Sequence, residues 1–298
     1  MPAPGGPRGS ARQKVTHAPR SVHGDAGRRA LTAPTVAGVE LGTARPGDVS
    51  VVAHRGGAGL GPENQLATFA TSHALGVRVL ETDARATADG VAVAHHDATL
   101  DRTTTLRGAV RDRRFAELGG QVLRMDELLM AYDDVELLVD VKEARVVGPL
   151  VAAIQATRSA DRVWVAGGWD HWLAAVVERC PGVRPALGWR GLSTLMWSAR
   201  RGVRPRRLAG RAQAAHVPWR LNGVRWLADE RVAARLVDQC ADLGLVLRAW
   251  TIDRPDLQRR LVRQGVPSII TDRPDLAREV LIGENRWSPM GTALSLVE

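Results

Sequence analysis

The sequence predicts a (β/α)8 barrel, the TIM-barrel fold of the α/β class. From about residue 49, short runs rich in β-branched residues alternate with helical patterns, which is typical of a parallel sheet with helical crossovers. Nine strands are predicted, and one is the second arm of a hairpin around Asp89-Gly90, which leaves eight principal strands. No glycine-rich nucleotide-binding fingerprint follows the first strand, so an open nucleotide-binding sheet is disfavoured.

The predicted strands are short and apolar, as expected for strands buried on both faces. In chain order they cover residues 50–55, 77–85, 91–96, 136–142, 162–166, 184–188, 212–218, 245–252 and 267–271. The strand at 91–96 forms a small hairpin insertion after the second strand.

Helical patterns fall between most of these strands. The clearest cover residues 62–75, 229–243 and 256–264, where apolar residues recur at helical spacing. Asp229 can cap the second of these helices, and Gly265 stands just past the end of the third.

Composition bounds the remaining organisation of the 298-residue chain. Residues 1–48 are rich in Pro, Gly, Ala and Arg and lack apolar periodicity, so we expect a disordered leader, followed by the barrel at 49–285 and a C-terminal tail at 286–298. No apolar run is long enough to span a bilayer, and the first residues lack the apolar block of a secretory signal. We therefore expect a cytoplasmic protein.

The formal net charge of +9 raises the question of nucleic-acid binding. Of 41 basic residues only Lys14 and Lys142 are lysines, and this skew indicates a compositional bias toward arginine. The chain also lacks a helix-turn-helix or RNA-binding signature, so nucleic acid is an unlikely partner.

Polar side chains gather where the predicted strands end, which is the rim that carries the active site in this fold. They are His54, Arg55, Glu81, Asp83, His96, Asp140 and Lys142. Residues two apart on a strand point to the same face, and carboxylates among apolar neighbours need a cation or a strong hydrogen-bonding partner.

Three of these carboxylates predict a metal site. Glu81, Asp83 and Asp140 lie on neighbouring strands and offer the oxygen ligands that Mg²⁺ or Ca²⁺ prefers. The alternative is that they form ion pairs with Arg55, Arg85 and Lys142 inside the barrel. For the set as a whole we favour the divalent cation.

The two histidines predict acid–base chemistry. His54 and His96 titrate near neutrality, so one can act as base and the other as acid, and the residues leave open which is which. Arg55 and Lys142 would then stabilise an anionic oxygen together with the metal. This combination indicates phosphoryl transfer on a diester.

The ordered set of motifs resembles the glycerophosphodiester phosphodiesterases. The motifs are His54-Arg55-Gly56, Pro62-Glu63-Asn64, Glu81-x-Asp83, Asp89-Gly90, His96-Asp97-x-x-Leu100-x-Arg102-Thr103-Thr104, Asp140-Val141-Lys142, Trp250-Thr251, Gly265-Val266 and Ile269-Ile270-Thr271-Asp272-Arg273-Pro274. They extend from about residue 50 to residue 280 in the order and spacing expected of this family.

The resemblance implies hydrolysis of a small-molecule glycerophosphodiester to glycerol 3-phosphate and an alcohol, with a divalent cation. It implies that His54 and His96 are the acid–base pair, that Glu81, Asp83 and Asp140 are the metal ligands, and that Arg55 and Lys142 bind the phosphate. Further residues are expected around this set. Glu63 would order the first loop, Asn64 would start the following helix, and Trp250 would pack either on the glycerol or in the barrel core.

Two departures from the family pattern stand out. Asp140 occupies a position where the family commonly has glutamate, so the third ligand sits farther back. The strand end at 166–169 lacks the Ser-Phe often found there, which bears on substrate contacts on that side.

A basic, tryptophan-containing stretch gives an alternative function. Residues 179–228 contain eleven arginines, four tryptophans and no Asp or Glu. We interpret 190–211 as a long loop or short amphipathic helix on the active-site side, where it would contact an anionic membrane. The simpler interpretation is a solvated arginine-rich loop.

Two further functions are thus weighed beside the leading one. The first is a lipid-directed, phospholipase D-like or lysophospholipase D activity at a membrane surface. The second is a catalytically inactive barrel that serves as a binding protein, which the intact histidine pair and carboxylates argue against.

Overall fold

The computed structural model describes residues 47–205, 208 and 210–288. The leader predicted at 1–48 falls outside these residues except for its last two, and so does most of the tail predicted at 286–298. The first residue of the predicted barrel contacts the first residue of the predicted tail, because the Val49 N–H donates to the Arg286 carbonyl at 3.0 Å. The domain boundaries stay predictions.

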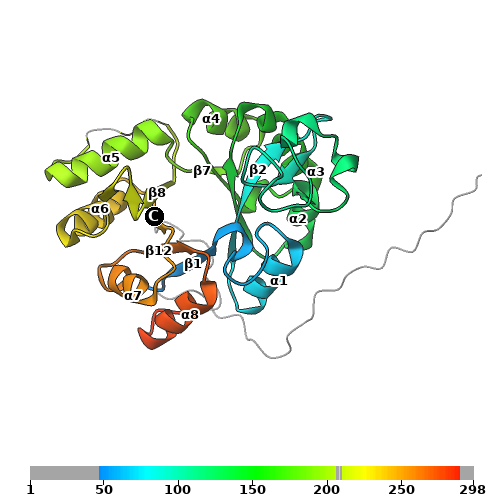
Figure 1. Ribbon diagram of the computed structural model, residues 1–298. Helices are drawn as coiled ribbons and strands as arrows, with labels where there is room; N and C mark the ends of the chain where they lie inside the picture. Colours follow the sequence, from blue (N-terminus) through cyan, green and yellow to red (C-terminus); the bar gives the residue numbers. More distant parts are fainter. Residues whose placement is uncertain (1–46, 206–207, 209, 289–298) are drawn as a thin grey trace, which may run out of the picture. The chain divides into compact units, whose positions relative to one another are not determined.

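Eight parallel strands form the barrel (Figure 1). They are β1 (Ser50–Ala53), β2 (Val79–Ala86), β5 (Glu136–Val141), β6 (Val163–Ala166), β7 (Arg184–Pro185), β8 (Ala214–Pro218), β11 (Val246–Trp250) and β12 (Ser268–Thr271). Hydrogen bonds join them in the order β7-β6-β5-β2-β1-β12-β11-β8. Ala186 bridges to Ala214 across the two ends of this order, so the barrel is nearly closed. The predicted fold class is confirmed.

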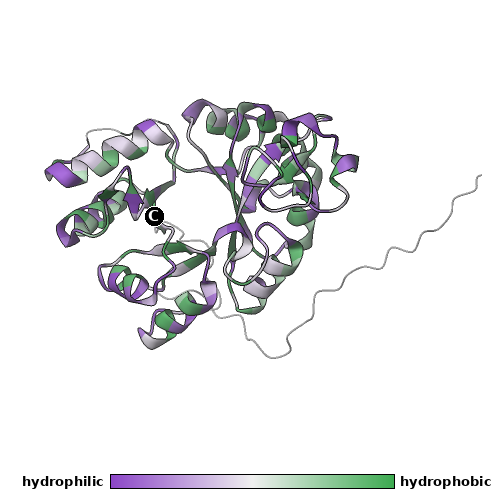
Figure 2. Ribbon diagram, viewed as in Figure 1, coloured by the Kyte–Doolittle hydropathy of each residue, from purple (hydrophilic) through white to green (hydrophobic). Residues whose placement is uncertain are grey.

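Helices pack around the barrel and turn their apolar sides toward the strands (Figure 2). They are α1 (Leu66–Ala74), α2 (Met125–Ala131), α3 (Val147–Thr157), α4 (Asp170–Arg179), α5 (Trp189–Arg201), α6 (Glu230–Asp242), α7 (Pro255–Arg263) and α8 (Pro274–Gly283). As predicted, Asp229 caps α6, because its Oδ1 accepts hydrogen bonds from the Arg231 and Val232 N–H groups.

Short elements complete the fold. β3 (Ala92–Ala94) runs antiparallel to β2 and forms the predicted hairpin, and β4 (Leu123–Arg124) extends it. A second hairpin joins β9 (Arg220–Leu221) to β10 (Val224–Arg225) after β8. The 3-10 helices are η1 (His54–Gly56), η2 (Val110–Asp112), η3 (Phe115–Leu118), η4 (Ala144–Val146) and η5 (Ala160–Arg162).

The barrel interior contains an arginine–tryptophan stack, which we define as Arg184, Trp164 and Arg248. The two guanidinium groups lie over the Trp164 ring, at 4.4 Å for Arg184 and 4.2 Å for Arg248. Glu136 accepts a hydrogen bond from Trp164 Nε1 at 2.9 Å and pairs with Arg184 at 2.8 Å. Cation–π contacts of this kind strengthen when they are removed from water.

The arginine-rich segment takes a different position from the one predicted. Residues 189–201 form α5, the crossover helix between β7 and β8, and a crossover in a parallel sheet must run from the carboxyl ends of the strands back to the amino ends. Its first turn lies at the active-site rim, whereas Arg204, just beyond its end, pairs with Asp242 at the end of α6. The expectation that 190–211 lies on the active-site side is therefore wrong beyond the first turn. Residues 206, 207 and 209 lie outside the described residues.

Within the part of the chain that the structure describes, every helix is too short or too polar to cross a bilayer.

Two neighbouring residues of α2 test the packing. Leu129 is completely buried, whereas Met130 is 64% exposed. We expect Leu129→Ala to lower the free energy of unfolding by about 2–5 kcal/mol, because it removes buried methyl groups and leaves a cavity. Met130→Ala should change it by less than about 0.5 kcal/mol. Denaturant unfolding measures both, and equal losses would contradict the assignment of the buried face.

Candidate active site

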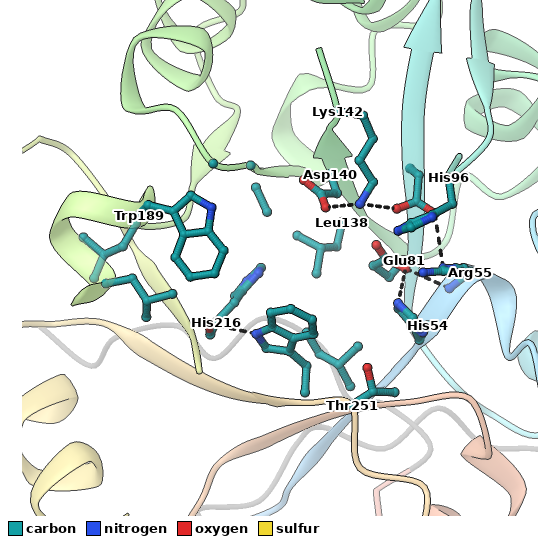
Figure 3. Close-up of a pocket in the computed structure, with 18 residues that line it drawn as sticks. His54, Arg55, Glu81, His96, Leu138, Asp140, Lys142, Trp189, His216 and Thr251 are labelled. Atoms are coloured by element: carbon teal, nitrogen blue, oxygen red, sulfur yellow. Dashed lines mark hydrogen bonds and ion pairs between the residues drawn. The ribbon is translucent and has the colours of Figure 1, made fainter. Parts of the chain in front are cut away.

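A cavity of about 280 Å³ lies among the carboxyl ends of the barrel strands (Figure 3). It brings together most of the residues that the sequence singled out, namely His54, Arg55, Glu81, Asp83, His96, Asp140, Lys142 and Trp250. Glu63 and Asn64 do not line the cavity and contact its residues from behind. Side chains far apart in the sequence therefore share one site.

His54 directly follows β1 and is held by a carboxylate from the last strand. Its Nδ1 lies 2.7 Å from Asp272 Oδ1, and its Nε2 lies 3.9 Å from Glu81 Oε2. A carboxylate at this distance keeps a proton on Nδ1 and leaves Nε2 to act on a substrate. Burial lowers the pKa of His54, but the charges of Glu81 and Asp272 outweigh that effect and raise it overall.

His96 has a similar carboxylate partner. Its Nδ1 lies 2.7 Å from Asp97 Oδ1, and Arg102 donates to the other Asp97 oxygen at 2.6 Å. The hydrogen bond from Arg102 holds the pKa of Asp97 well below its usual range, so this carboxylate stays charged. Burial lowers the pKa of His96 despite the Asp97 bond. Each histidine thus pairs with an aspartate, but the pKa of His54 is raised and the pKa of His96 is lowered.

The predicted carboxylates form a charged centre with Lys142. Asp83 on β2 and Asp140 on β5 are register partners, as expected from their strand positions. Lys142 Nζ lies 2.8 Å from Asp83 Oδ1 and 2.5 Å from Asp140 Oδ2. Burial lowers the pKa of Lys142, but Asp140 and Asp83 raise it well above its usual value, so the ammonium stays charged.

Glu81 is the least stabilised of these carboxylates. Its side chain accepts the backbone N–H of Arg55 at 2.7 Å but has no lysine against it. Burial, together with the charge of Asp83, raises the pKa of Glu81 to about 7. An added positive charge at this point would favour the ionised form.

The donor set fits a hard divalent cation in its chemistry. Glu81, Asp83 and Asp140 supply carboxylate oxygens from one face of the barrel, and the buried Glu81 is the group that a cation would stabilise most. Their present arrangement pairs two of the donors with Lys142 instead. Among the described residues, no group of three or more His, Cys, Asp or Glu side chains is close enough to enclose an ion. The ligand set stays a prediction.

Asn64 has a different role from the one expected. It does not start α1, which begins at Leu66 after Gln65. Its buried side chain instead donates to Asp83 Oδ2 at 3.2 Å and accepts from the Thr82 hydroxyl at 2.8 Å. The backbone of Asn64 has a φ of 57°, a conformation that Asn tolerates better than most residues and that aims the amide at Asp83.

Several residues at the site were not assigned a role from the sequence. Asp97, Arg102 and Asp272 lie inside motifs that were quoted for the resemblance, so their position after strand ends was the available signal. Arg102 also reaches Glu63 at 2.7 Å, and Glu63 in turn contacts Arg55, which ties the loop after β1 to the loop after β3. These contacts order the two histidine-bearing loops together.

The apolar part of the cavity was also unassigned. Trp189 and His216 line it, and neither belongs to a recognisable motif. Trp250 lines the cavity as well, and its Nε1 donates to the His216 carbonyl at 3.0 Å. Trp250 also packs against the apolar cluster inside the barrel, so its contact with the glycerol stays a prediction.

Comparisons with known proteins identify relatives of this chain. The model of the glycerophosphoryl diester phosphodiesterase family matches residues 54–164 and 176–276. The chain is 34% identical over 255 residues to a probable glycerophosphodiester phosphodiesterase 2 of Mycobacterium tuberculosis, covering 82% of this chain and 94% of that relative. It is 29% identical over 248 residues to a glycerophosphodiester phosphodiesterase of Caldanaerobacter subterraneus, covering 76% and 94%.

Solved structures show the same fold. A putative glycerophosphoryl diester phosphodiesterase from Silicibacter pomeroyi superposes with a TM-score of 0.66 at 24% identity, covering 82% of this chain and 97% of that one. An Oleispira antarctica phosphodiesterase, solved in complex with the product sn-glycerol-3-phosphate, gives a TM-score of 0.62 at 19% identity, covering 79% and 97%.

The His54–Asp272 pair gives a test of the site. We expect Asp272→Asn to lower kcat on a diester substrate by about 10²–10⁴-fold with little change in KM, because the amide no longer favours a proton on His54 Nδ1. Asp275→Asn is the matched control, since Asp275 lies in the first turn of α8, pairs with Arg273 and does not line the cavity. Steady-state kinetics of both variants decide the point, and an unchanged kcat for Asp272→Asn would rule out the positioning role.

Proposed function

The chain belongs to the glycerophosphoryl diester phosphodiesterase family and has the phosphodiesterase activity of that family, and we propose that its two histidines carry out the reaction with the help of a divalent cation. The observation that carries this proposal is the meeting of His54, His96, Arg55 and Lys142 in one cavity beside three carboxylates. The alternative of an inactive binding barrel has no support in the family relationship.

The acid–base step follows from the two histidine–aspartate pairs. Hydrolysis forms a bond from a water oxygen to phosphorus and breaks the bond from phosphorus to the alcohol oxygen. One histidine takes the proton from the attacking water, and the other gives a proton to the departing alcohol oxygen. Asp272 and Asp97 hold the two rings in position for these transfers.

Two cationic side chains would hold the phosphate between the histidines. Arg55 and Lys142 both line the cavity, and both are anchored by Asp83, at 3.5 Å for Arg55 Nε and 2.8 Å for Lys142 Nζ. Fixed cations stabilise the extra negative charge that develops on the phosphoryl oxygens in the transition state.

We assign the cation-binding role to Glu81, Asp83 and Asp140, with Mg²⁺ or Ca²⁺ as the ion. When bound, such an ion supplies Lewis-acid stabilisation of charge on the phosphoryl oxygens. The oxygen-rich donor set and the burial of Glu81 support this assignment.

The proposed reaction is tested with purified protein and two soluble substrates, glycerophosphocholine and glycerophosphoethanolamine. We expect release of glycerol 3-phosphate that EDTA abolishes and that added Mg²⁺ or Ca²⁺ restores. His54→Ala and His96→Ala should each lower kcat by at least about 10²-fold, because each removes a proton-transfer group. Circular dichroism shows whether the variants fold. Full activity in EDTA would refute the metal, and active histidine variants would refute the acid–base assignment.

A lipid-borne diester is the second candidate substrate, and exposed tryptophans at the cavity mouth favour it. Trp189 lines the cavity and is 41% exposed, and Trp169 is 58% exposed. Trp169 forms an aromatic cluster with His171 and Trp172, with ring centroids 6.2 and 6.1 Å away. Exposed indoles are typical of surfaces that contact the membrane interface.

Vesicle binding tests this second candidate. We expect the protein to co-sediment with phosphatidylcholine vesicles that contain phosphatidylglycerol, and Trp169→Ala to weaken this binding without changing hydrolysis of soluble glycerophosphocholine. Trp197, 44% exposed and two turns along α5, is the matched control. Weaker binding of Trp197→Ala alone would move the contact to the segment 190–211, and no binding by the wild type would remove the membrane contact.

A further inference from the structure

The cavity has two chemically different sides. We define its far wall as Trp189, His216 and Trp250. Trp189 and His216 lie across the cavity from His54, His96 and Glu81 (Figure 3). Among the described residues that line the cavity, every Asp and Glu belongs to β2 or β5 rather than to the far wall. The far wall therefore offers aromatic surface and a single imidazole.

The His216 side chain on this wall has an unpaired polar atom. His216 lies on β8, and its backbone carbonyl accepts the Trp250 indole N–H at 3.0 Å, which fixes the Trp250 side chain against the backbone of β8 at this residue. Its Nε2 atom is buried and has no hydrogen-bond partner anywhere in the described chain. Buried polar atoms are normally paired, so an unpaired one on a cavity wall points to a ligand.

The arginine–tryptophan stack lies next to this imidazole. Arg248 is the register partner of His216 on the adjacent strand β11 and is 3% exposed. Burial and the charge of Arg248 lower the pKa of His216 to about 3, so the ring is neutral at physiological pH. A neutral imidazole has one N–H donor and one nitrogen acceptor, which suits a hydroxyl group.

The same stack disfavours a cation on the far wall. Arg184 and Arg248 carry two positive charges against the single carboxylate of Glu136. A choline or ethanolamine group bound here would find no carboxylate partner, and the charges of the two arginines would oppose the attraction that the indole faces offer to a cation. The substituent that suits this wall is uncharged, with carbon faces for the indoles and hydroxyls for the imidazole, which describes glycerol.

We propose that His216 is a specificity-determining residue that hydrogen-bonds a hydroxyl of the substrate's glycerol moiety on the far wall, an inference that rests on the proposed function. The phosphate then lies between the histidines, and the alcohol leaves on the side away from the far wall. The glycerol is the part common to all such substrates, so its recognition in a buried position is independent of the headgroup.

The test compares glycerophosphocholine with its two analogues that each lack one glycerol hydroxyl. For the wild type we expect kcat/KM to fall by about 10–100-fold on removal of the contacted hydroxyl, because the imidazole is then left unpaired. His216→Phe should lower kcat/KM on glycerophosphocholine by a similar factor and should abolish the discrimination for one analogue. His216→Gln, which keeps a hydrogen-bond donor and an acceptor, should retain part of the discrimination between glycerophosphocholine and this analogue.

A matched control and an independent measurement keep the result interpretable. His73→Phe changes a histidine on α1 that pairs with Asp134 outside the cavity, and it should leave the discrimination unchanged. Equal losses on all three substrates in His216→Phe would show a structural role and overturn the proposal.

If the protein hydrolyses no diester, the proposed function fails. A binding measurement then tests the role of His216 separately. Calorimetry measures the affinity of the wild type and of His216→Phe for sn-glycerol 3-phosphate and for propyl phosphate. The substitution should weaken the binding of sn-glycerol 3-phosphate and leave that of propyl phosphate unchanged. Equal affinities of the two proteins for sn-glycerol 3-phosphate would overturn the inference.

Discussion

The ion pairs of Lys142 with Asp83 and Asp140 are the interaction on which the rest of the site depends. Two carboxylates at the end of a nearly closed barrel are stable only with a cation among them, and Lys142 supplies that charge from the position just after β5, the strand of Asp140. Asp83 in turn anchors Arg55 and Asn64, which position the loop after β1. The phosphate-binding cations and the candidate metal ligands thus belong to a single charged network.

The asymmetry of the cavity follows from where the barrel places its charges. β2 and β5 carry the carboxylates, and Lys142 directly follows β5, whereas β8 and β11 carry His216 and Trp250 next to a buried positive stack. A phosphodiester has a charged centre and two different substituents, and a cavity with one charged and one neutral side can orient such a molecule. Orientation of this kind lowers the entropic cost of bringing the diester against the histidines.

The topology also decides which surfaces face the substrate. α5 contains much of the arginine-rich segment, but as a crossover helix it leads away from the cavity and ends beside α6. The exposed indoles of Trp169 and Trp189 remain at the mouth because they lie at the starts of α4 and α5, where chains leave the carboxyl ends of the strands. The position of a residue within its βα unit matters more here than the composition of its segment.

The sequence by itself determined the eight principal strands, the hairpin at Asp89-Gly90, the cap at Asp229 and the cluster of polar residues at strand ends. Each of these depends on local chemistry, since strand spacing puts Glu81 with Asp83 on one face and a capping side chain acts within one helical turn. Only the tertiary structure decided the contact of His54 with Asp272, 218 residues away, and the pairing of Arg248 with His216. It also decided that Asn64 holds Asp83 and that α5 leaves the active-site rim. The reason is that barrel closure and strand register bring together residues that no local periodicity relates.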